Sequence, residues 1–178
     1  MRKSTLLNII GTLESYEIGK LRSFTIDDPI KKEKSSMYLR RNRIAYLFQN
    51  FALVDKMTVE ENMLLATRYN SVKDKKALIK KSLNKMGVLN KLNSKVYELS
   101  GGEQQRVALA RNMVKPYDIM LADEPTGSLD EQNKKIVMEA LMSINSKGKT
   151  IVVVTHDVDF EKISHRNYII EDCKLVEI

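Results

Sequence analysis

Two apolar segments, separated by one helical segment, restrict the fold more than any other feature of the chain. Residues 117–124 (YDIMLADE) and 150–157 (TIVVVTHD) are apolar runs that end in polar or charged residues. Between them, residues 128–144 repeat their apolar side chains at helical spacing. A strand, a helix and a second strand without a polar face indicate parallel strands in a sheet that is covered on both faces. The sequence therefore predicts an α/β fold.

The rest of the chain predicts further helices and strands. Thr58 and Glu61 form a capping box that predicts the start of one helix. Residues 44–48 predict a buried strand that ends at Gln49. The other expected elements are helices over residues 3–13, 36–41 and 74–86, a strand within residues 19–27, and two short closing strands, residues 167–172 and 174–178, joined by a turn at Asp172-Cys173.

Length, charge and cysteine content set broader limits. A chain of 178 residues predicts one domain, and its apolar runs are far shorter than the ~20 residues of a membrane-spanning helix. A lone cysteine, Cys173, allows no internal disulfide and indicates a reducing compartment, so we expect a cytoplasmic protein. The net charge of +7 is dispersed along the chain, and its lysines are best explained as solvent-exposed residues of helices and loops. Attraction of this charge to nucleic acid or to anionic lipid stays an alternative.

The segment LSGGEQQR, residues 99–106, contains a Ser-Gly-Gly turn that opens directly into a helix. Gly101 and Gly102 let the backbone approach an anion closely, and the N–H groups at a helix start carry positive partial charge. Ser100 adds a hydroxyl donor. An ordinary capped helix explains the turn equally well when it is considered alone.

Polar side chains follow the expected parallel strands at their carboxyl ends, where sheets of this class place their ligands. Asp123 and Glu124 end one strand, His156 ends the next, and Gln49 ends the strand over residues 44–48. One carboxylate could hold Mg²⁺ while the other orients an attacking water. Two surface carboxylates in a turn and a structural histidine are the plainer explanations.

The first residues resemble the second half of a phosphate-binding loop. That loop, G-x-x-x-x-G-K-[ST], opens into a helix, and Lys3, Ser4 and Thr5 before an apolar stretch match its end. Arg2 stands where the second glycine belongs. Because most of the loop's backbone amides are not identified in the sequence, we expect a weakened phosphate site, incomplete on its amino-terminal side.

In this order, the segments resemble the ATP-binding cassette family, the ATPase subunits of ABC transporters. The resemblance covers essentially the whole chain and rests chiefly on LSGGEQQR and on ADEPTGSLD, residues 122–130. It implies a P-loop NTPase-type α/β domain over residues 1–178, truncated within the phosphate-binding loop and lacking its first strands. A helical subdomain is expected at about residues 55–112. The implied cofactors are ATP and Mg²⁺.

The family resemblance also implies roles for individual residues. Catalysis is assigned to Glu124 as general base, to His156 at the γ-phosphate and to Gln49 at the metal and attacking water. Mg²⁺ is assigned to Ser4, Gln49 and Asp123. Contacts with ATP are assigned to Lys3, Ser4, Thr5, Ser100, Gly101, Gly102, Gln104 and Asp130. Of these, the residues from 100 onward would act across a dimer interface.

Residues 47–62, LFQNFALVDKMTVEEN, are similar to exporters of the bacteriocin or antimicrobial-peptide, macrolide and lipoprotein-release group. The implied partners are a second cassette, identical or not, in a head-to-tail dimer, and a transmembrane permease that holds the cassettes at the inner face of the cell membrane. Nucleic acid is not an expected partner. Two alternatives stay open: a non-catalytic fragment that lends LSGGEQQR to an intact cassette, and a soluble cassette that acts on nucleic acid.

Overall fold

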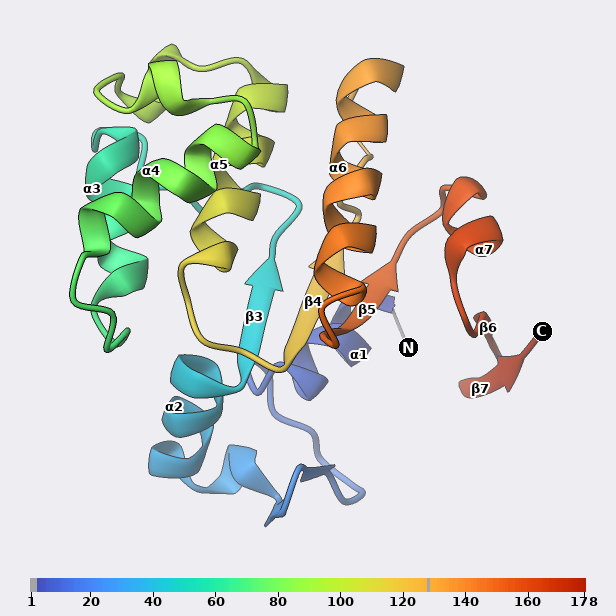
Figure 1. Ribbon diagram of the computed structural model, residues 1–178. Coiled ribbons are helices and arrows are strands. Elements are labelled where there is room, and N and C mark those ends of the chain that lie inside the picture. The colour runs from blue at the N-terminus through green and yellow to red at the C-terminus, as the bar shows by residue number, and fades with distance from the viewer. Residues whose placement is uncertain (1–2, 128) are drawn as a thin grey trace.

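The computed structural model describes residues 3–127 and 129–178 of the chain (Figure 1). Arg2, which was assigned to the place of a loop glycine, lies outside the described residues, as does Ser128. Along the chain the helices and strands are α1 (Lys3–Ile10), β1 (Arg22–Ser23), β2 (Ile26–Asp27), α2 (Glu33–Asn42), β3 (Ile44–Leu47), α3 (Val59–Thr67), α4 (Lys75–Lys85), α5 (Gly101–Met113), β4 (Ile119–Asp123), α6 (Glu131–Asn145), β5 (Thr150–Val154), α7 (Asp159–Ile163), β6 (Tyr168–Glu171) and β7 (Lys174–Glu177).

A parallel sheet in the order β3-β4-β5 forms the centre of the fold. Ile119 at the start of β4 lies opposite Ile44 of β3 on one side and Thr150 of β5 on the other. Because the three strands start level and run the same way, their carboxyl ends reach one edge of the sheet together. The predicted α/β fold with a parallel sheet is confirmed.

Helices cover both faces of this sheet, as the apolar strands predicted. Met120 and Ala122 of β4 belong to the apolar core that includes α5 and α6. Leu121, between them in sequence, packs on the opposite face with Leu7 of α1 and Leu39 of α2. Successive side chains of a strand point to opposite faces, so one strand contributes to two cores.

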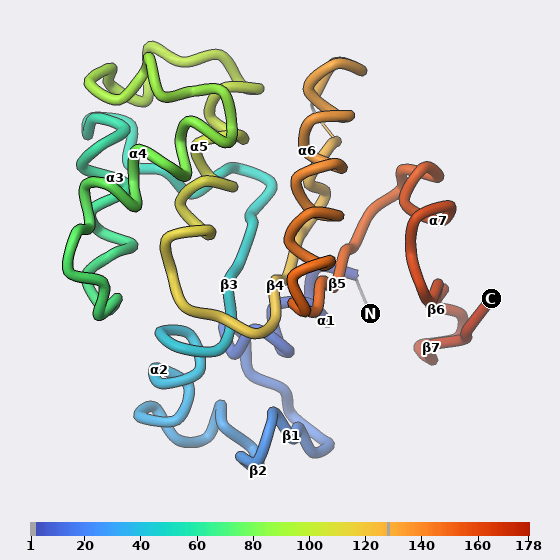
Figure 2. Tube along the Cα trace, viewed as in Figure 1, coloured from blue at the N-terminus to red at the C-terminus, as the bar shows by residue number. Residues whose placement is uncertain are grey.

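Helices α3, α4 and α5 pack against one another beside the sheet. Figure 2 shows α3 and α4 beside α5 on the side of the molecule away from α7. Thr58 caps α3 in a capping box with Glu61, as predicted, and the Asp74 carboxylate caps α4. Met63 of α3 and Leu83 of α4 share the same apolar core as the sheet. A separate helical subdomain at about residues 55–112 stays a prediction.

Two of the expected elements were too long. The strand predicted within residues 19–27 is instead a small antiparallel hairpin of β1 and β2, because Phe24 adopts a left-handed conformation with φ of 55° and turns the chain back. Helix α1 ends at Ile10 rather than at residue 13. Thr12 ends the helix because it adopts a left-handed conformation with φ of 58°, and the Leu13 N–H closes the last turn by donating to the Asn8 carbonyl oxygen over 2.8 Å. Just before it, α1 passes close to β4: a Cβ atom on Gly11 would lie 3.0 Å from the Leu121 side chain.

The prediction that the strand at residues 150–157 has no solvent-exposed face was also wrong. Its side chains from Ile151 to Val154 are only partly buried. Among the described strands, β5 pairs with β4 alone, so it forms an edge of the sheet. The closing strands β6 and β7 form the expected hairpin, with Asp172 and Cys173 at φ of 46° and 62° in its two-residue turn. No helix in the described part of the chain has the length and apolarity that crossing a membrane requires.

Candidate functional site

The first turn of α1 meets the carboxyl ends of β4 and β5. Ser4 Oγ donates a hydrogen bond to Asp123 Oδ1 over 3.0 Å, and Lys3 Nζ donates one to the Thr155 carbonyl oxygen over 3.3 Å. Thr5 follows on α1 and is half-buried. The helix start and the lysine place positive charge beside the carboxylate of Asp123. The fold therefore joins residues that are far apart in sequence.

Glu124 occupies a strained turn directly after β4. Its φ of 43° lies in the left-handed region, which costs a non-glycine residue on the order of 1 kcal/mol or more. The Glu124 N–H donates to the carbonyl oxygen of Val154 over 2.8 Å, which ties the turn to β5. The backbone conformation turns the carboxylate of Glu124 toward the residues that follow β5.

The Glu124 carboxylate accepts hydrogen bonds from both residues after β5. Thr155 Oγ1 donates to Glu124 Oε2 over 3.1 Å, and the His156 N–H donates to the same oxygen over 3.4 Å. His156 Nε2 lies 3.7 Å from Glu124 Oε1, a distance that allows an ion pair when the imidazole is protonated. The side chain of Glu124 is 19% exposed and that of His156 is 82% exposed. A sheltered carboxylate thus lies beside an accessible imidazole.

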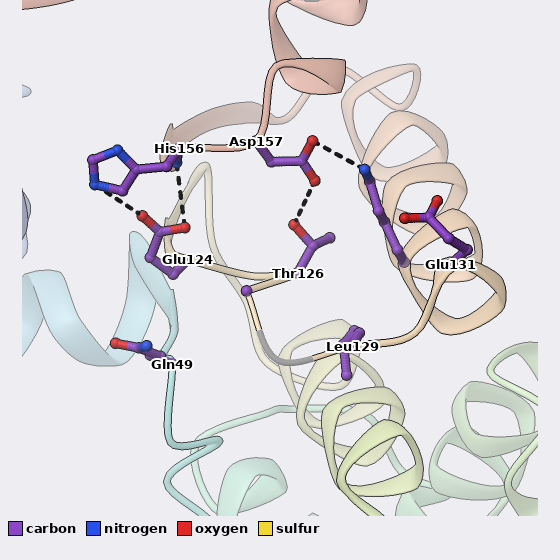
Figure 3. A pocket seen from close by; sticks show the side chains of 9 residues that line it. Gln49, Glu124, Thr126, Leu129, Glu131, His156 and Asp157 are labelled. Atoms are coloured by element: carbon purple, nitrogen blue, oxygen red, sulfur yellow. Dashed lines mark hydrogen bonds and ion pairs between the residues drawn. The ribbon is translucent and has the colours of Figure 1, made fainter.

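These groups border an open pocket of about 500 Å³ (Figure 3). Its walls come from the ends of β3, β4 and β5 and from the start of α6, with Gln49, Glu124, Thr126 and His156 among the lining residues. In Figure 3 the side chain of Gln49 lies below that of Glu124, on the strand segment that leads out of β3. Gln49 is exposed, so its amide can contact a ligand in the pocket.

The residues present fit a Mg²⁺-phosphate group. Among the described residues, no three His, Cys, Asp or Glu side chains gather closely enough to hold a metal ion by themselves. Mg²⁺ does not need such a cage, because it is usually bound by one or two protein oxygens together with phosphate and water oxygens. The hydroxyl of Ser4 and the carboxylate of Asp123 supply two such oxygens at one place, and Lys3 and the start of α1 supply positive charge for phosphate.

The remaining predicted residues form a second group at the starts of α5 and α6. Ser100 caps α5: its Oγ accepts the Glu103 N–H over 3.3 Å, and Glu103 Oε2 accepts the Ser100 N–H over 2.8 Å. Gln104 Nε2 donates to the carbonyl oxygen of Leu99 over 3.1 Å. Asp130 caps α6, with Asp130 Oδ1 accepting the Asn133 N–H over 2.8 Å. That hydrogen bond lowers the pKa of the Asp130 carboxyl below its usual value.

Gly102 and Asn133 bring the starts of α5 and α6 together. A Cβ atom on Gly102 would lie 2.6 Å from the Asn133 side chain, whereas one on Gly101 would meet open space. Asn133 Nδ2 also donates to Asp130 Oδ2 over 2.6 Å, and Asn133 Oδ1 accepts from Arg106. The structure therefore gathers the predicted residues in two groups, one at the sheet edge and one at these helix starts.

Five residues near the two groups were not singled out from the sequence: Gln105, Thr126, Asn133, Lys134 and Asp157. Gln105 of α5 donates through Nε2 to the Pro125 carbonyl oxygen over 2.7 Å and supports the Glu124 turn. Asn133, Thr126 and Lys134 contact predicted site residues or their neighbours. The motifs EPT and THD place Thr126 and Asp157 next to Glu124 and His156 in sequence, a signal that could have identified them. Asn133 and Lys134 gave no such signal.

Comparison with known proteins identifies the family of the chain. Residues 3–127 match the family model described as ABC transporter. The chain belongs to the ABC transporter family. It is 37% identical to an uncharacterized ABC transporter ATP-binding protein, YvrO of Bacillus subtilis, over 98% of this chain and 77% of that protein. It is 38% identical to the lipoprotein-releasing system ATP-binding protein LolD of Aquifex aeolicus, over 98% of this chain and 79% of LolD.

Two further similarities concern an export protein and a solved structure. The chain is 40% identical to the macrolide export ATP-binding/permease protein MacB of Campylobacter jejuni, over 87% of this chain and 24% of MacB. The dimeric structure of a post-hydrolysis state of the ATP-binding cassette MJ0796 bound to ADP and Pi superposes with a TM-score of 0.89 and 33% identity, covering 99% of this chain and 79% of that chain. The predicted cassette fold is thereby confirmed.

Gly102 provides a test of the contact between α5 and α6. We expect Gly102→Ala to displace the Asn133 side chain and to cost about 1 kcal/mol of unfolding free energy through lost hydrogen bonds. Gly101→Ala is the matched control, because its added methyl group meets open space and alanine is a better helix former than glycine. Urea unfolding of both variants measures the difference. Equal stability of the two variants would contradict the tight contact at Gly102.

Asp159, on α7, provides a pH test of the ion pairs beside the site. Hydrogen bonds from Lys134 and then Lys162 lower the pKa of Asp159 to about 2. In an unfolded chain the pKa of aspartate is about 3.9. The stabilisation from ionised Asp159 is therefore present above the unfolded value and is lost as the pH falls from about 5 toward about 2.

We accordingly expect the unfolding free energy of the wild-type chain to fall more steeply with acidification than that of Asp159→Asn. Urea unfolding at a series of pH values measures both slopes. Asp55→Asn, at an exposed position in another part of the chain, serves as the control and should keep the wild-type slope. A wild-type slope in Asp159→Asn would argue against the ion pairs at α7.

Proposed function

We propose that this chain is the ATP-binding and ATP-hydrolysing subunit of an ABC exporter. The observation that carries the proposal is the hydrogen bond between Ser4 and Asp123. Lys3 lies beside this bond, and Glu124 directly follows Asp123 at the end of β4. Phosphate, metal and water chemistry can act on one ligand only if these groups meet at one place. The proposal is further supported by the likeness to MJ0796, whose structure is described as bound to ADP and Pi.

In this proposal, the first turn of α1 binds the phosphates. Lys3 contacts the β- and γ-phosphates, Thr5 lies at the α-phosphate, and Ser4, Asp123 and Gln49 hold Mg²⁺ and its water shell. When bound, Mg²⁺ neutralises charge on the phosphate oxygens. The side chain of Lys3 leaves the Thr155 carbonyl to reach the phosphates, an exchange that is easy for a flexible ammonium group.

Glu124 acts as the general base and His156 as the contact to the γ-phosphate. The Glu124 carboxylate is sheltered yet borders the pocket, so it can accept a proton from a water molecule placed there. The exposed imidazole of His156 can swing toward the phosphate while its backbone N–H stays on Glu124. One backbone contact thus keeps the base and the imidazole near each other.

The group around Ser100 acts on ATP held by a second cassette. The start of α5 presents N–H groups and the open face of Gly101, which suits a phosphate that arrives from outside the chain. Gln104 borders this surface, and Asp130 lies at the interface. MJ0796 is described as dimeric in both matched structures. A head-to-tail pair of cassettes would complete two equivalent sites.

The exporter also requires a transmembrane permease, which would hold the cassette at the inner face of the cell membrane. The printed names of the relatives support export: LolD belongs to a lipoprotein-releasing system and MacB to macrolide export. We propose a bacteriocin, an antimicrobial peptide or a similar amphiphile as the cargo, on the likeness of LFQNFAL to exporters of that group.

Substitution of Glu124 tests the catalytic part of the proposal. We expect Glu124→Gln to bind Mg-ATP but to hydrolyse it about 1,000-fold more slowly, because the amide cannot accept the proton. Glu139→Gln, an exposed position on α6, is the matched control and should keep the wild-type rate. Phosphate release and nucleotide binding are measured side by side. Wild-type hydrolysis by Glu124→Gln would exclude Glu124 as the base, and no Mg-ATP binding by the wild-type chain would favour a non-catalytic fragment.

The cargo is tested in the strain that encodes the chain. Changing the Glu124 codon to a glutamine codon should sensitise the cells to cationic amphipathic peptides, because the exporter loses its source of energy. Growth inhibition is measured across a peptide series and a macrolide series. Increased sensitivity to macrolides alone would replace the proposed cargo with a macrolide-like one.

A further inference from the structure

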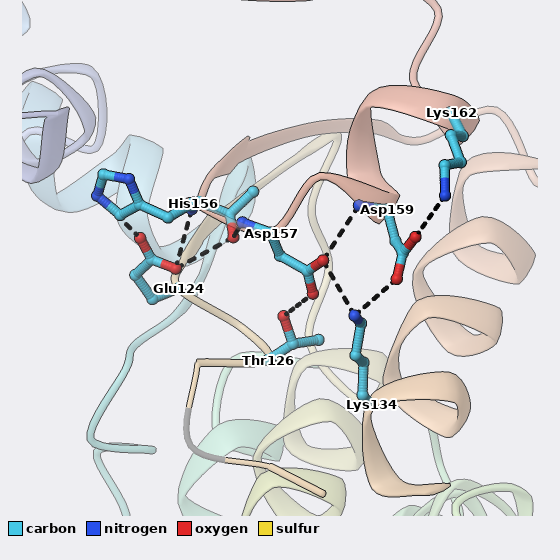
Figure 4. A network of polar contacts seen from close by, with 8 residues as sticks. Glu124, Thr126, Lys134, His156, Asp157, Asp159 and Lys162 are labelled. Atoms are coloured by element: carbon cyan, nitrogen blue, oxygen red, sulfur yellow. Dashed lines mark hydrogen bonds and ion pairs between the residues drawn. The ribbon is translucent and has the colours of Figure 1, made fainter. Parts of the chain in front are cut away.

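The residue that follows His156 connects two parts of the site. Thr126 Oγ1 donates to Asp157 Oδ2 over 3.0 Å, and the Asp157 N–H donates to Thr155 Oγ1 over 3.0 Å (Figure 4). Thr126 is 5% exposed and lies two residues after Glu124. Asp157 therefore joins the turn that carries Glu124 to the turn that carries His156.

A lysine from another helix holds Asp157 in place. Lys134 Nζ lies 3.0 Å from Asp157 Oδ1 and 2.7 Å from Asp159 Oδ2, and its side chain is only 15% exposed. The Asp159 N–H also donates to Asp157 Oδ1 over 3.1 Å. Without the ammonium group, two carboxylates would face each other with less compensating charge, and their repulsion would separate them.

The titration behaviour of these groups agrees with their contacts. Burial alone would raise the pKa of Asp157, but hydrogen bonds from the Asp159 N–H and from Lys134 outweigh burial and lower it. Hydrogen bonds to Asp159 and then Asp157 raise the pKa of Lys134 above its usual value. The three groups are therefore charged together near neutral pH.

Lys134 also belongs to the second group of site residues through its helix. It lies in the first turns of α6, next to Asn133, which contacts Asp130 and packs against Gly102 of α5. Lys134 thus provides a side-chain link from α6, whose start meets the Ser-Gly-Gly turn, to the loop that carries His156. In Figure 4 this link runs from the ribbon of α6 to the loop between β5 and α7.

We propose that Lys134 is a positioning residue for ATP hydrolysis: through Asp157 it holds the His156 turn against the Glu124 turn and fixes both relative to the start of α6. The inference rests on the proposed ATPase function. It assigns to Lys134 no contact with the nucleotide. Loss of Lys134 should therefore lower the rate of the chemical step without weakening the binding of ATP.

Three variants of the full chain test this role. Lys134→Met should lower kcat about 10-fold with little change in KM, because small misplacements of catalytic groups are costly. Lys134→Arg should recover most of the rate, since a guanidinium can bridge two carboxylates. Lys162→Met is the matched control: Lys162 contacts Asp159 Oδ1 over 2.8 Å on the outer side and is 73% exposed. It removes the same charge and should keep the wild-type kcat.

Hydrogen exchange of the His156, Asp157 and Asp159 amides gives a readout that needs no ATP. We expect faster exchange at these amides in Lys134→Met and wild-type exchange in Lys162→Met. Wild-type kcat and exchange in Lys134→Met would overturn the proposal, as would a folded Lys134→Arg that is as slow as Lys134→Met. An equal loss of kcat in Lys162→Met would also overturn it.

The same measurements separate this inference from the proposed function. If the wild-type chain does not hydrolyse Mg-ATP, the proposed function fails, and the exchange measurement alone decides whether Lys134 holds the His156 turn. If the wild-type chain hydrolyses ATP and Glu124→Gln does not, the proposed function stands, and the kcat of Lys134→Met decides the role of Lys134.

Discussion

The parallel pairing of β4 with a strand on each side is the constraint on which the rest of the structure depends. It aligns the carboxyl ends of β3, β4 and β5 at one edge, so side chains from three distant parts of the sequence meet there. The alternation of side chains along β4 anchors α1 on one face and α5 and α6 on the other. Once β4 is in register, the start of α1 and the start of α6 approach the same edge. The site is a consequence of how the sheet is assembled.

Much of this arrangement could be predicted from sequence, because it follows from local rules. Apolar runs predicted the strands, and the tendency of parallel sheets to bind ligands at their carboxyl ends predicted that Asp123, Glu124 and His156 would lie together. The rules failed where long-range contacts decide the outcome. The chain leaves α1 at Thr12, whose left-handed backbone follows the close approach of Gly11 to Leu121, and β5 is partly exposed because it is an edge strand. Lys134 looked like one more surface lysine, since nothing local shows that two aspartates surround it.

The two groups of predicted site residues present different surfaces. The polar side chains at the sheet edge are hydrogen-bonded to one another within the chain, Ser4 to Asp123 and Thr155 to Glu124. The group at the starts of α5 and α6 is held by Asn133 and by the capping box of Ser100, and Gly101 faces open space. This contrast agrees with the proposed roles, in which the group at the sheet edge binds the nucleotide and the other group contacts the nucleotide of a second cassette.

The left-handed backbone of Glu124 has a consequence for how the chain tolerates change. Asparagine or glycine would adopt this conformation at a lower energetic cost than glutamate, so either would relax the turn that follows β4. Each would also remove the long carboxylate that reaches Thr155 and His156. Stability and chemistry therefore make opposite demands on this one position. If Glu124 is the general base as proposed, a search for more stable versions of the protein that ignored activity would be expected to replace it early and to produce a more stable protein that does not hydrolyse ATP.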